Sequence, residues 1–84
     1  MATGTIRYWA AAREAAGVDE EQYDALSLAE ALEHARTLHG DTLAKVLRRC
    51  SYVVDDAPVG IRDHAVIELS DRGTVEVLPP FAGG

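Results

Sequence analysis

The chain has 84 residues, which is enough for one domain around a single hydrophobic core. Its composition, 48% apolar and 26% charged, is typical of a globular protein, and no apolar run approaches the roughly 20 residues of a membrane span. The net charge of −6 argues against a nucleic-acid partner, whose phosphates would repel it. A single cysteine, Cys50, and the lack of a signal-peptide pattern favour a cytoplasmic protein.

The first predicted element is a strand at residues 4–10. Alternation places Ile6 and Tyr8 on one face of this strand and Arg7 and Trp9 on the other. If the first pair faces the core, Trp9 lies on the far side of the sheet.

Two short elements follow. Residues 11–16 are rich in alanine and predict a turn or short helix, which Gly17 can end because glycine readily adopts a left-handed conformation. Residues 20–25 predict a second strand, anchored mainly by Tyr23.

The clearest helix signal begins at Ser27. Ser27 and Glu30 have the spacing of a capping box, in which each side chain accepts a hydrogen bond from the other residue's backbone N–H. Gly40 ends this helix, and a second, shorter helix is expected from about Thr42. Apolar residues recur at helical spacing, at Leu28, Ala31, Leu32, Ala35 and Leu38 in the first helix, where they define one buried stripe, and at Leu43, Val46, Leu47 and Cys50 in the second.

The last third of the chain alternates between strand and turn signals. Residues 61–71 give no clear strand register. The expected elements are a strand at 52–54, a turn at 55–58, an extended segment from Val59, a short strand at 65–69, a turn at 71–73 and a final strand at 74–78.

This order predicts an α+β protein. Two strands, a helix and two or three further strands give the β-grasp (ubiquitin-like) arrangement, in which a mixed sheet of four to five strands packs on one main helix plus a short second helix. The last strand is expected to lie centrally. Residues 1–78 would form the domain and residues 79–84 an extended tail.

The tail, Pro79-Pro80-Phe81-Ala82-Gly83-Gly84, is the most informative motif. Its prolines have no backbone N–H and end the strand. Fully extended, six residues span about 20 Å. Because the segment has no charged side chain, its only charge is the terminal carboxylate. The pattern predicts delivery of this carboxylate into a narrow site on another protein, with a frayed chain end as the alternative.

No convincing site is found among the other reactive side chains. His34 and His39 point in different directions on the predicted helix, and His64 lies alone in a loop, so no metal site is expected. Cys50 falls on an apolar stripe and indicates a structural thiol. By elimination, the terminal carboxylate is the only group poised for chemistry.

That carboxylate needs activation, because its negative charge repels nucleophiles. ATP-dependent adenylation would turn it into a mixed anhydride with a good leaving group. Gly84 has no Cβ to shield the acyl carbon, and Gly83 lets the backbone thread a channel too narrow for a side chain. A sulfur nucleophile or an amine would then take the acyl group, so the tail is a substrate and reagent rather than a catalyst.

Over nearly its whole length the chain resembles the small, sulfur-carrying subunit of molybdopterin synthase, the MoaD-like branch of the β-grasp sulfur carriers. The most specific segments are Leu78–Gly84 and Arg7–Glu14. Two segments depart from the family pattern, the turn at 72–74 and the irregular stretch at 63–68. Neither touches the tail.

The resemblance implies a reaction sequence for Gly84. A MoeB-like adenylyltransferase would use ATP to adenylate it, and a sulfurtransferase would supply the sulfur for a thiocarboxylate. The tail would then enter a MoaE-like large subunit, in a heterotetramer, and donate its sulfur to cyclic pyranopterin monophosphate. Two deliveries build the dithiolene of molybdopterin. The carrier itself is expected to bind no cofactor.

The family also has apolar docking residues on the open face of its sheet. By position these correspond to Trp9 and Leu78, with Pro58 or Val59 nearby. The alternative for Trp9 is burial under a loop. The tail residues expected to contact the partner are Pro79, Pro80, Phe81 and Ala82.

Three other functions remain open. One is a sulfur carrier for thiazole or cysteine synthesis, which usually lacks Pro-Pro-Phe before its two glycines. Another is a ubiquitin-like protein modifier that forms isopeptide bonds through Gly84. The third is an interaction module with an inert tail.

Overall fold

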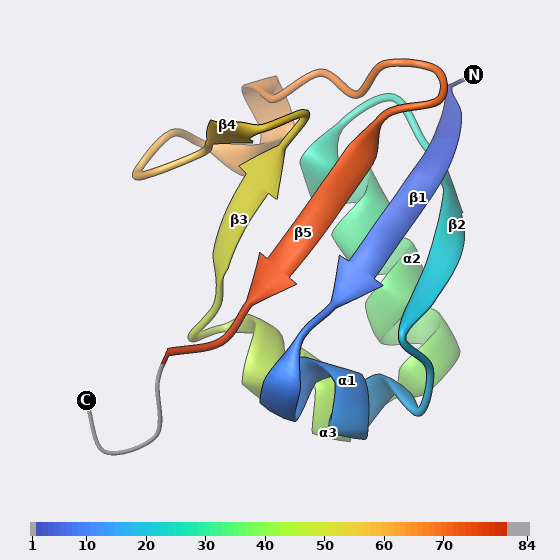
Figure 1. The fold of residues 1–84 in the computed structure, drawn as a ribbon, viewed down its shortest axis with the longest axis vertical. Coiled ribbons are helices and arrows are strands. Elements are labelled where there is room, and N and C mark those ends of the chain that lie inside the picture. Colours follow the sequence, from blue (N-terminus) through green and yellow to red (C-terminus); the bar gives the residue numbers. More distant parts are fainter. Residues whose placement is uncertain (1, 81–84) are drawn as a thin grey trace.

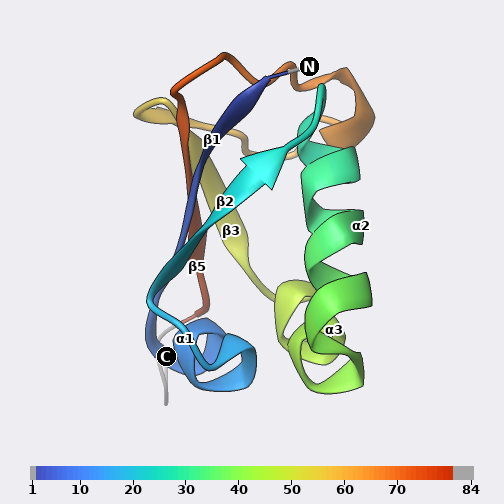
Figure 2. The same cartoon turned by 90° about the vertical axis from the view of Figure 1, so that its right-hand side faces the viewer.

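The computed structural model describes residues 2–80 (Figure 1). Its elements are β1 (Thr3–Tyr8), α1 (Ala10–Ala16), β2 (Glu20–Asp24), α2 (Leu28–His39), α3 (Asp41–Leu47), β3 (Ser51–Val54), β4 (Ala57–Pro58), the 3₁₀ turn η1 (His64–Val66) and β5 (Thr74–Leu78). Helices α2 and α3 lie over one face of the sheet, and no described helix lies over the other (Figure 2). Within residues 2–80 no helix has the length and apolar character needed to cross a membrane.

The strands form one five-stranded sheet in the order β2-β1-β5-β3-β4. The last strand, β5, lies in the middle, where it pairs in parallel with β1 and antiparallel with β3 (Figure 1). β2 pairs antiparallel with β1, and β4 pairs antiparallel with β3. The predicted α+β fold, a β-grasp with a central final strand, is confirmed.

The hydrophobic core lies between the sheet and the helices. Strand alternation sends Ile6 and Tyr8 of β1 and Val75 and Val77 of β5 to the helix-covered face, where all four are buried. Full burial of one large aliphatic side chain contributes about 1.5–3 kcal/mol. The facing residues of α2 are Leu28, Ala31, Leu32 and Ala35. This packing fixes which side chains of β1 and β5 point toward the open face.

The predicted helix ends are largely confirmed. α1 ends at Gly17, whose φ is 79°. Ser27 Oγ accepts a hydrogen bond from the Glu30 N–H at 3.2 Å, which is one half of the capping box. The predicted burial of Leu38 is wrong, since this side chain is 70% exposed. The stripe of α2 instead continues four residues beyond Ala35 to the half-buried His39.

The turn after β3 is tighter than predicted. Asp55 and Asp56 have φ values of 50° and 69°, and these two residues alone close the β3–β4 hairpin. Two-residue hairpin turns with positive φ at both positions match the twist of the flanking strands. The extended segment is therefore Ala57–Pro58, and the prediction that it starts at Val59 is wrong.

The predicted strand at residues 65–69 is also wrong. The 3₁₀ turn η1 occupies His64–Val66, and Glu68 makes only an isolated bridge to Ser27. Ile67 and Leu69 each reach the core without forming a strand. Their burial explains why apolar residues occur in this segment although it forms no strand.

Candidate functional site

The base of the tail is held on both sides by the sheet. Leu78, the last residue of β5, pairs with Ser51 of β3, and the Trp9 N–H donates to the Val77 carbonyl at 3.2 Å. Pro79 and Pro80 follow β5 and belong to no strand. The other predicted tail residues, Phe81, Ala82, Gly83 and Gly84, lie outside the described residues.

The open face of the sheet carries the side chains that alternate with the core-facing ones along each strand. The register places Arg7, Glu76 and Val53 next to one another across β1, β5 and β3, with Pro58 beside Val53. Leu78 lies two residues further along β5. These side chains and Trp9 form the open-face patch, which consists of Arg7, Trp9, Val53, Pro58, Glu76 and Leu78.

Trp9 is the most prominent apolar side chain of the patch. It is 42% exposed, which confirms that it faces away from the core. The Arg7 guanidinium carbon lies 5.4 Å from the centroid of the indole ring, and Arg7 Nε lies 3.7 Å from Glu20 Oε2. Arg7 therefore contacts the indole and a carboxylate together, which restricts the orientation of Trp9. An exposed, restrained tryptophan is typical of an interface anchor.

The other predicted docking residues divide by exposure. Pro58 and Pro80 are exposed, and Leu78 and Pro79 are half-buried. The prediction that Val59 lies near the open face is wrong, because its side chain is only 2% exposed. The short β3–β4 turn places Val59 opposite Tyr52, whose carbonyl accepts the Val59 N–H at 2.9 Å.

Sequence reasoning missed three residues of the patch. The alternation in β1 could have identified Arg7, because this residue alternates with Ile6 and Tyr8 and shares a face with Trp9. Val53 and Glu76 needed the strand register, which brings them together from segments more than 20 residues apart. No periodicity within one segment encodes that pairing.

A partly buried polar cluster joins β1, β2 and α2 on the helix-covered face. The Tyr8 hydroxyl donates to Glu21 Oε2 at 2.5 Å, and His39 Nε2 lies 2.7 Å from the same oxygen. Burial, followed by the Glu21 hydrogen bond, raises the pKa of Tyr8 far above its ordinary value. This cluster links elements that pack around the core and lies away from the open-face patch.

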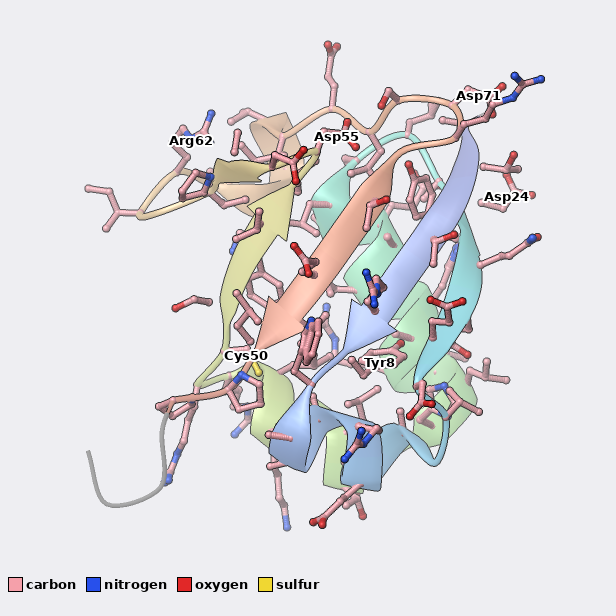
Figure 3. All side chains as sticks on the ribbon, in the orientation of Figure 1. Tyr8, Asp24, Cys50, Asp55, Arg62 and Asp71 are labelled. Atoms are coloured by element: carbon pink, nitrogen blue, oxygen red, sulfur yellow. The ribbon has the colours of Figure 1, made fainter. Side chains whose placement is uncertain are left out.

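Cys50 lies just before β3, at the end of the sheet where β5 finishes (Figure 3). Burial raises the pKa of its thiol to about 11, and its Sγ donates to the Val46 carbonyl at 3.2 Å. A thiol with this pKa is protonated at neutral pH, which agrees with a structural role. Among residues 2–80, no group of three or more His, Cys, Asp or Glu is placed to hold a metal ion.

Comparison with known protein families gives one match over nearly the whole chain. The sequence profile of the ThiS family matches residues 6–84. No curated protein sequence matches the chain.

Solved structures give several matches to the fold. The chain is similar to the small archaeal modifier protein 1 from Methanosarcina acetivorans, with a TM-score of 0.85, 19% identity and coverage of 100% of this chain and 98% of that one. It is similar to a putative molybdopterin converting factor subunit 1 from Pyrococcus furiosus, with a TM-score of 0.75, 21% identity and coverage of 96% and 100%.

A third similar structure is a protein–protein complex of subunits 1 and 2 of the molybdopterin-converting factor from Helicobacter pylori. The match has a TM-score of 0.67, 20% identity and coverage of 98% of this chain and 99% of that one. At these identities the three structures establish the shared fold.

Proposed function

Because the chain belongs to the ThiS family, we propose that it is a sulfur carrier, the small subunit of molybdopterin synthase. The observation that carries this proposal is the position of the tail base. The tail follows the central strand β5, directly beside the exposed Trp9. A partner that covers the open-face patch therefore also meets the tail.

In this proposal Gly84 carries the reactive carboxylate. A MoeB-like adenylyltransferase joins the carboxylate to AMP from ATP and releases pyrophosphate. Sulfur supplied by a sulfurtransferase then displaces AMP and leaves a thiocarboxylate. The carrier contributes an unhindered acyl group, since glycine has no Cβ beside the acyl carbon.

The proposed acceptor is cyclic pyranopterin monophosphate, bound in a MoaE-like large subunit. The thiocarboxylate gives its sulfur to the pterin precursor, and two deliveries complete the dithiolene. The likeness to one subunit of the Helicobacter pylori complex supports a second subunit as the partner. The proposed assembly is a heterotetramer with two large subunits at its centre and one carrier at each end.

The rigid base of the tail supports this mechanism. β5 is held by β1 on one side and β3 on the other, so the point where the tail starts is fixed relative to the open-face patch. Docking through Trp9 would then place the tail without a search over many orientations, which reduces the entropic cost of binding.

A covalent protein modifier is the second candidate, and the likeness to the small archaeal modifier protein 1 favours it. The same Gly84 adenylate would react with a lysine amine, releasing AMP and forming an isopeptide bond. The Pro79-Pro80-Phe81 segment favours the first candidate, through its resemblance to the molybdopterin synthase subunit. It also argues against the carriers for thiazole and cysteine synthesis.

The test is reconstitution with purified proteins. The carrier is incubated with the adenylyltransferase, ATP and a sulfurtransferase, and its intact mass is measured. We expect a mass gain equal to replacement of one oxygen by sulfur, located at Gly84, and formation of molybdopterin once the large subunit and cyclic pyranopterin monophosphate are added. Higher-mass conjugates in cell extracts without any thiocarboxylate would instead identify a modifier.

A further inference from the structure

Three cations gather at the end of α3. Of the eight Lys and Arg residues in the chain, Lys45, Arg48 and Arg49 lie within five consecutive positions. All three are exposed, and with Val46 they line a shallow depression of about 420 Å³. These three residues form the basic turn.

Four of the five other cations have side-chain partners within the fold, and Arg72 is the exception among residues 2–80. Arg7, Arg13 and Arg36 form ion pairs with carboxylates, and Arg62 donates to the carbonyls of Pro58 and Val59. Among residues 2–80 no carboxylate lies within ion-pair distance of the basic turn. Lys45 also lies three and four positions before Arg48 and Arg49, a spacing at which like charges repel one another. The cluster thus offers its charge to solvent.

The backbone that carries these cations is well fixed. The Arg49 N–H donates to the Val46 carbonyl at 3.0 Å, and the Cys50 N–H donates to the Leu47 carbonyl at 3.2 Å. The Tyr52 hydroxyl donates to the same Leu47 carbonyl at 2.7 Å. A fixed backbone keeps the three charges together, so binding orders only their side chains and not the main chain.

The basic turn lies at the end of the sheet from which the tail departs. Ser51 pairs with Leu78, so the residues just before Ser51 lie beside those just after Leu78 (Figure 1). Cys50, which follows Arg49, marks this position in Figure 3. An ion-pairing surface here would border whatever site receives the tail.

We propose that the basic turn docks against an acidic surface of the large subunit, next to the opening that receives the tail. This inference rests on the proposed function. It adds the charge of the large-subunit surface that surrounds the opening for the tail, which is called the rim below. Because the carrier as a whole has a net charge of −6, a partner with an acidic rim attracts only this end of the molecule. The attraction acts on the basic turn and the repulsion acts on the rest of the carrier, so encounter is oriented with the tail leading.

Two other roles for the cluster make different predictions. Cations at the C-terminal end of a helix stabilise its dipole, which would affect stability without affecting association. A second copy of this chain would place acidic residues on the basic turn, although two molecules of charge −6 repel each other overall.

The test compares two substitutions that change the net charge equally. Arg49→Glu alters the basic turn, and Arg72→Glu alters the turn at the opposite end of the sheet, next to Asp71 (Figure 3). Association of each variant with the purified large subunit is followed by stopped-flow fluorescence at low and at physiological salt. We expect Arg49→Glu to slow association about tenfold at low salt and to flatten its salt dependence, with a far smaller effect of Arg72→Glu.

Equal rate changes in both variants, or none, would overturn this proposal while leaving the proposed function intact, provided that the wild-type chain binds the large subunit. Lower stability of Arg49→Glu in urea with unchanged association would assign the cluster to the helix dipole. Self-association of the wild-type chain in sedimentation, lost in Arg49→Glu, would assign it to a second copy. Failure of the wild-type chain to bind the large subunit at any salt concentration would overturn both proposals.

Discussion

Trp9 alone connects the open-face patch to the base of the tail, the first through its side chain and the second through its backbone. Its backbone N–H is bonded to β5 one residue before Leu78, and its indole lies under the Arg7 guanidinium. A tryptophan has only two side-chain torsions, and here contact with Arg7 restricts them further. Burying such a side chain in a partner therefore costs little conformational entropy.

We expect Trp9→Ala to weaken binding to the large subunit by about 2 kcal/mol, or about 30-fold in Kd, because the partner loses its main apolar anchor. Titration calorimetry measures this directly. Leu38→Ala is the matched control, since Leu38 is exposed on α2 behind the sheet. Equal affinities for wild type and Trp9→Ala would remove Trp9 from the interface.

Gly84→Ala tests the threading of the tail. Gly84 follows the last strand by six residues, so we expect an unchanged free energy of unfolding together with a large loss of molybdopterin formation. The added methyl group makes the tail wider than the channel that is expected to admit it, and it also shields the acyl carbon from attack. A normal rate of molybdopterin synthesis by this variant would contradict the mechanism.

Cys50 is expected to react slowly with alkylating reagents. With a thiol pKa of about 11, only about one molecule in a thousand carries the thiolate at pH 8. Iodoacetamide labelling followed by mass spectrometry should accelerate as the pH rises toward 11, and it should be fast at pH 8 once the protein is unfolded in urea. Rapid labelling of the folded protein at pH 8 would show that the thiol is activated.

At the scale of secondary structure, the β3–β4 hairpin contains an informative pair of residues. Asp55 and Asp56 both have positive φ, yet among the contacts within residues 2–80 only the Asp55 side chain of the two makes hydrogen bonds. Its two carboxylate oxygens accept hydrogen bonds from the Thr74 N–H at 2.8 Å and from Ser70 Oγ at 2.6 Å. These bonds tie the hairpin turn to the start of β5.

Glycine at either position relieves the same backbone strain, so the difference between the two variants isolates these hydrogen bonds. We expect Asp55→Gly to be less stable than Asp56→Gly by about 1.5 kcal/mol or more. Urea denaturation followed by circular dichroism gives the comparison. Equal stabilities would mean that the Asp55 carboxylate does not support the turn.

The same hairpin shows how far local patterns determine this fold. Strong local signals gave β5 its bounds, because a turn precedes Thr74 and two prolines follow Leu78, and the Ser27 cap gave the start of α2. Residues 61–71 have no such signal, and their conformation depends on where Ile67 and Leu69 reach the core. The sequence left the open-face position of this segment to Pro58 or Val59, and only the pairing of Pro58 with Val53 assigns Pro58 to the open face and Val59 to the core.

At the scale of the whole molecule, all three tyrosine hydroxyls donate hydrogen bonds inside the fold. Burial is the main cause that raises the pKa of Tyr8, Tyr23 and Tyr52 above their ordinary values, as it does for Cys50. The folded state therefore favours the neutral form of each group. The stability that this provides is complete below the ordinary pKa values and is lost as the pH rises above them.

We expect the free energy of unfolding to be constant between pH 7 and 8 and to fall above about pH 9. The slope should approach about 1.4 kcal/mol per pH unit for each group that ionises only on unfolding. Urea denaturation at a series of pH values measures this, and Tyr8→Phe should reduce the slope by one such group. Stability that does not change up to pH 11 would contradict the burial of these hydroxyls.

The candidate site was predicted in part. The tail motif and the exposed phase of Trp9 follow from residues adjacent in sequence. The neighbours of Trp9 across the sheet, Val53 and Glu76, come together only through the register of β3 and β5. The three cations of the basic turn lie close together in the sequence. That they form no ion pair within residues 2–80 could be seen only in the folded structure.

The parallel pairing of β1 with β5 also has a mechanical consequence. A pull on the C-terminus acts along the axis of β5, so it loads the hydrogen bonds to β1 and β3 together, in shear, rather than opening them one after another. A partner that grips the tail can therefore exert force on it while the domain stays folded. Proteolytic machines that unravel substrates from the C-terminal end would meet a strand held on both sides as the first strand they reach.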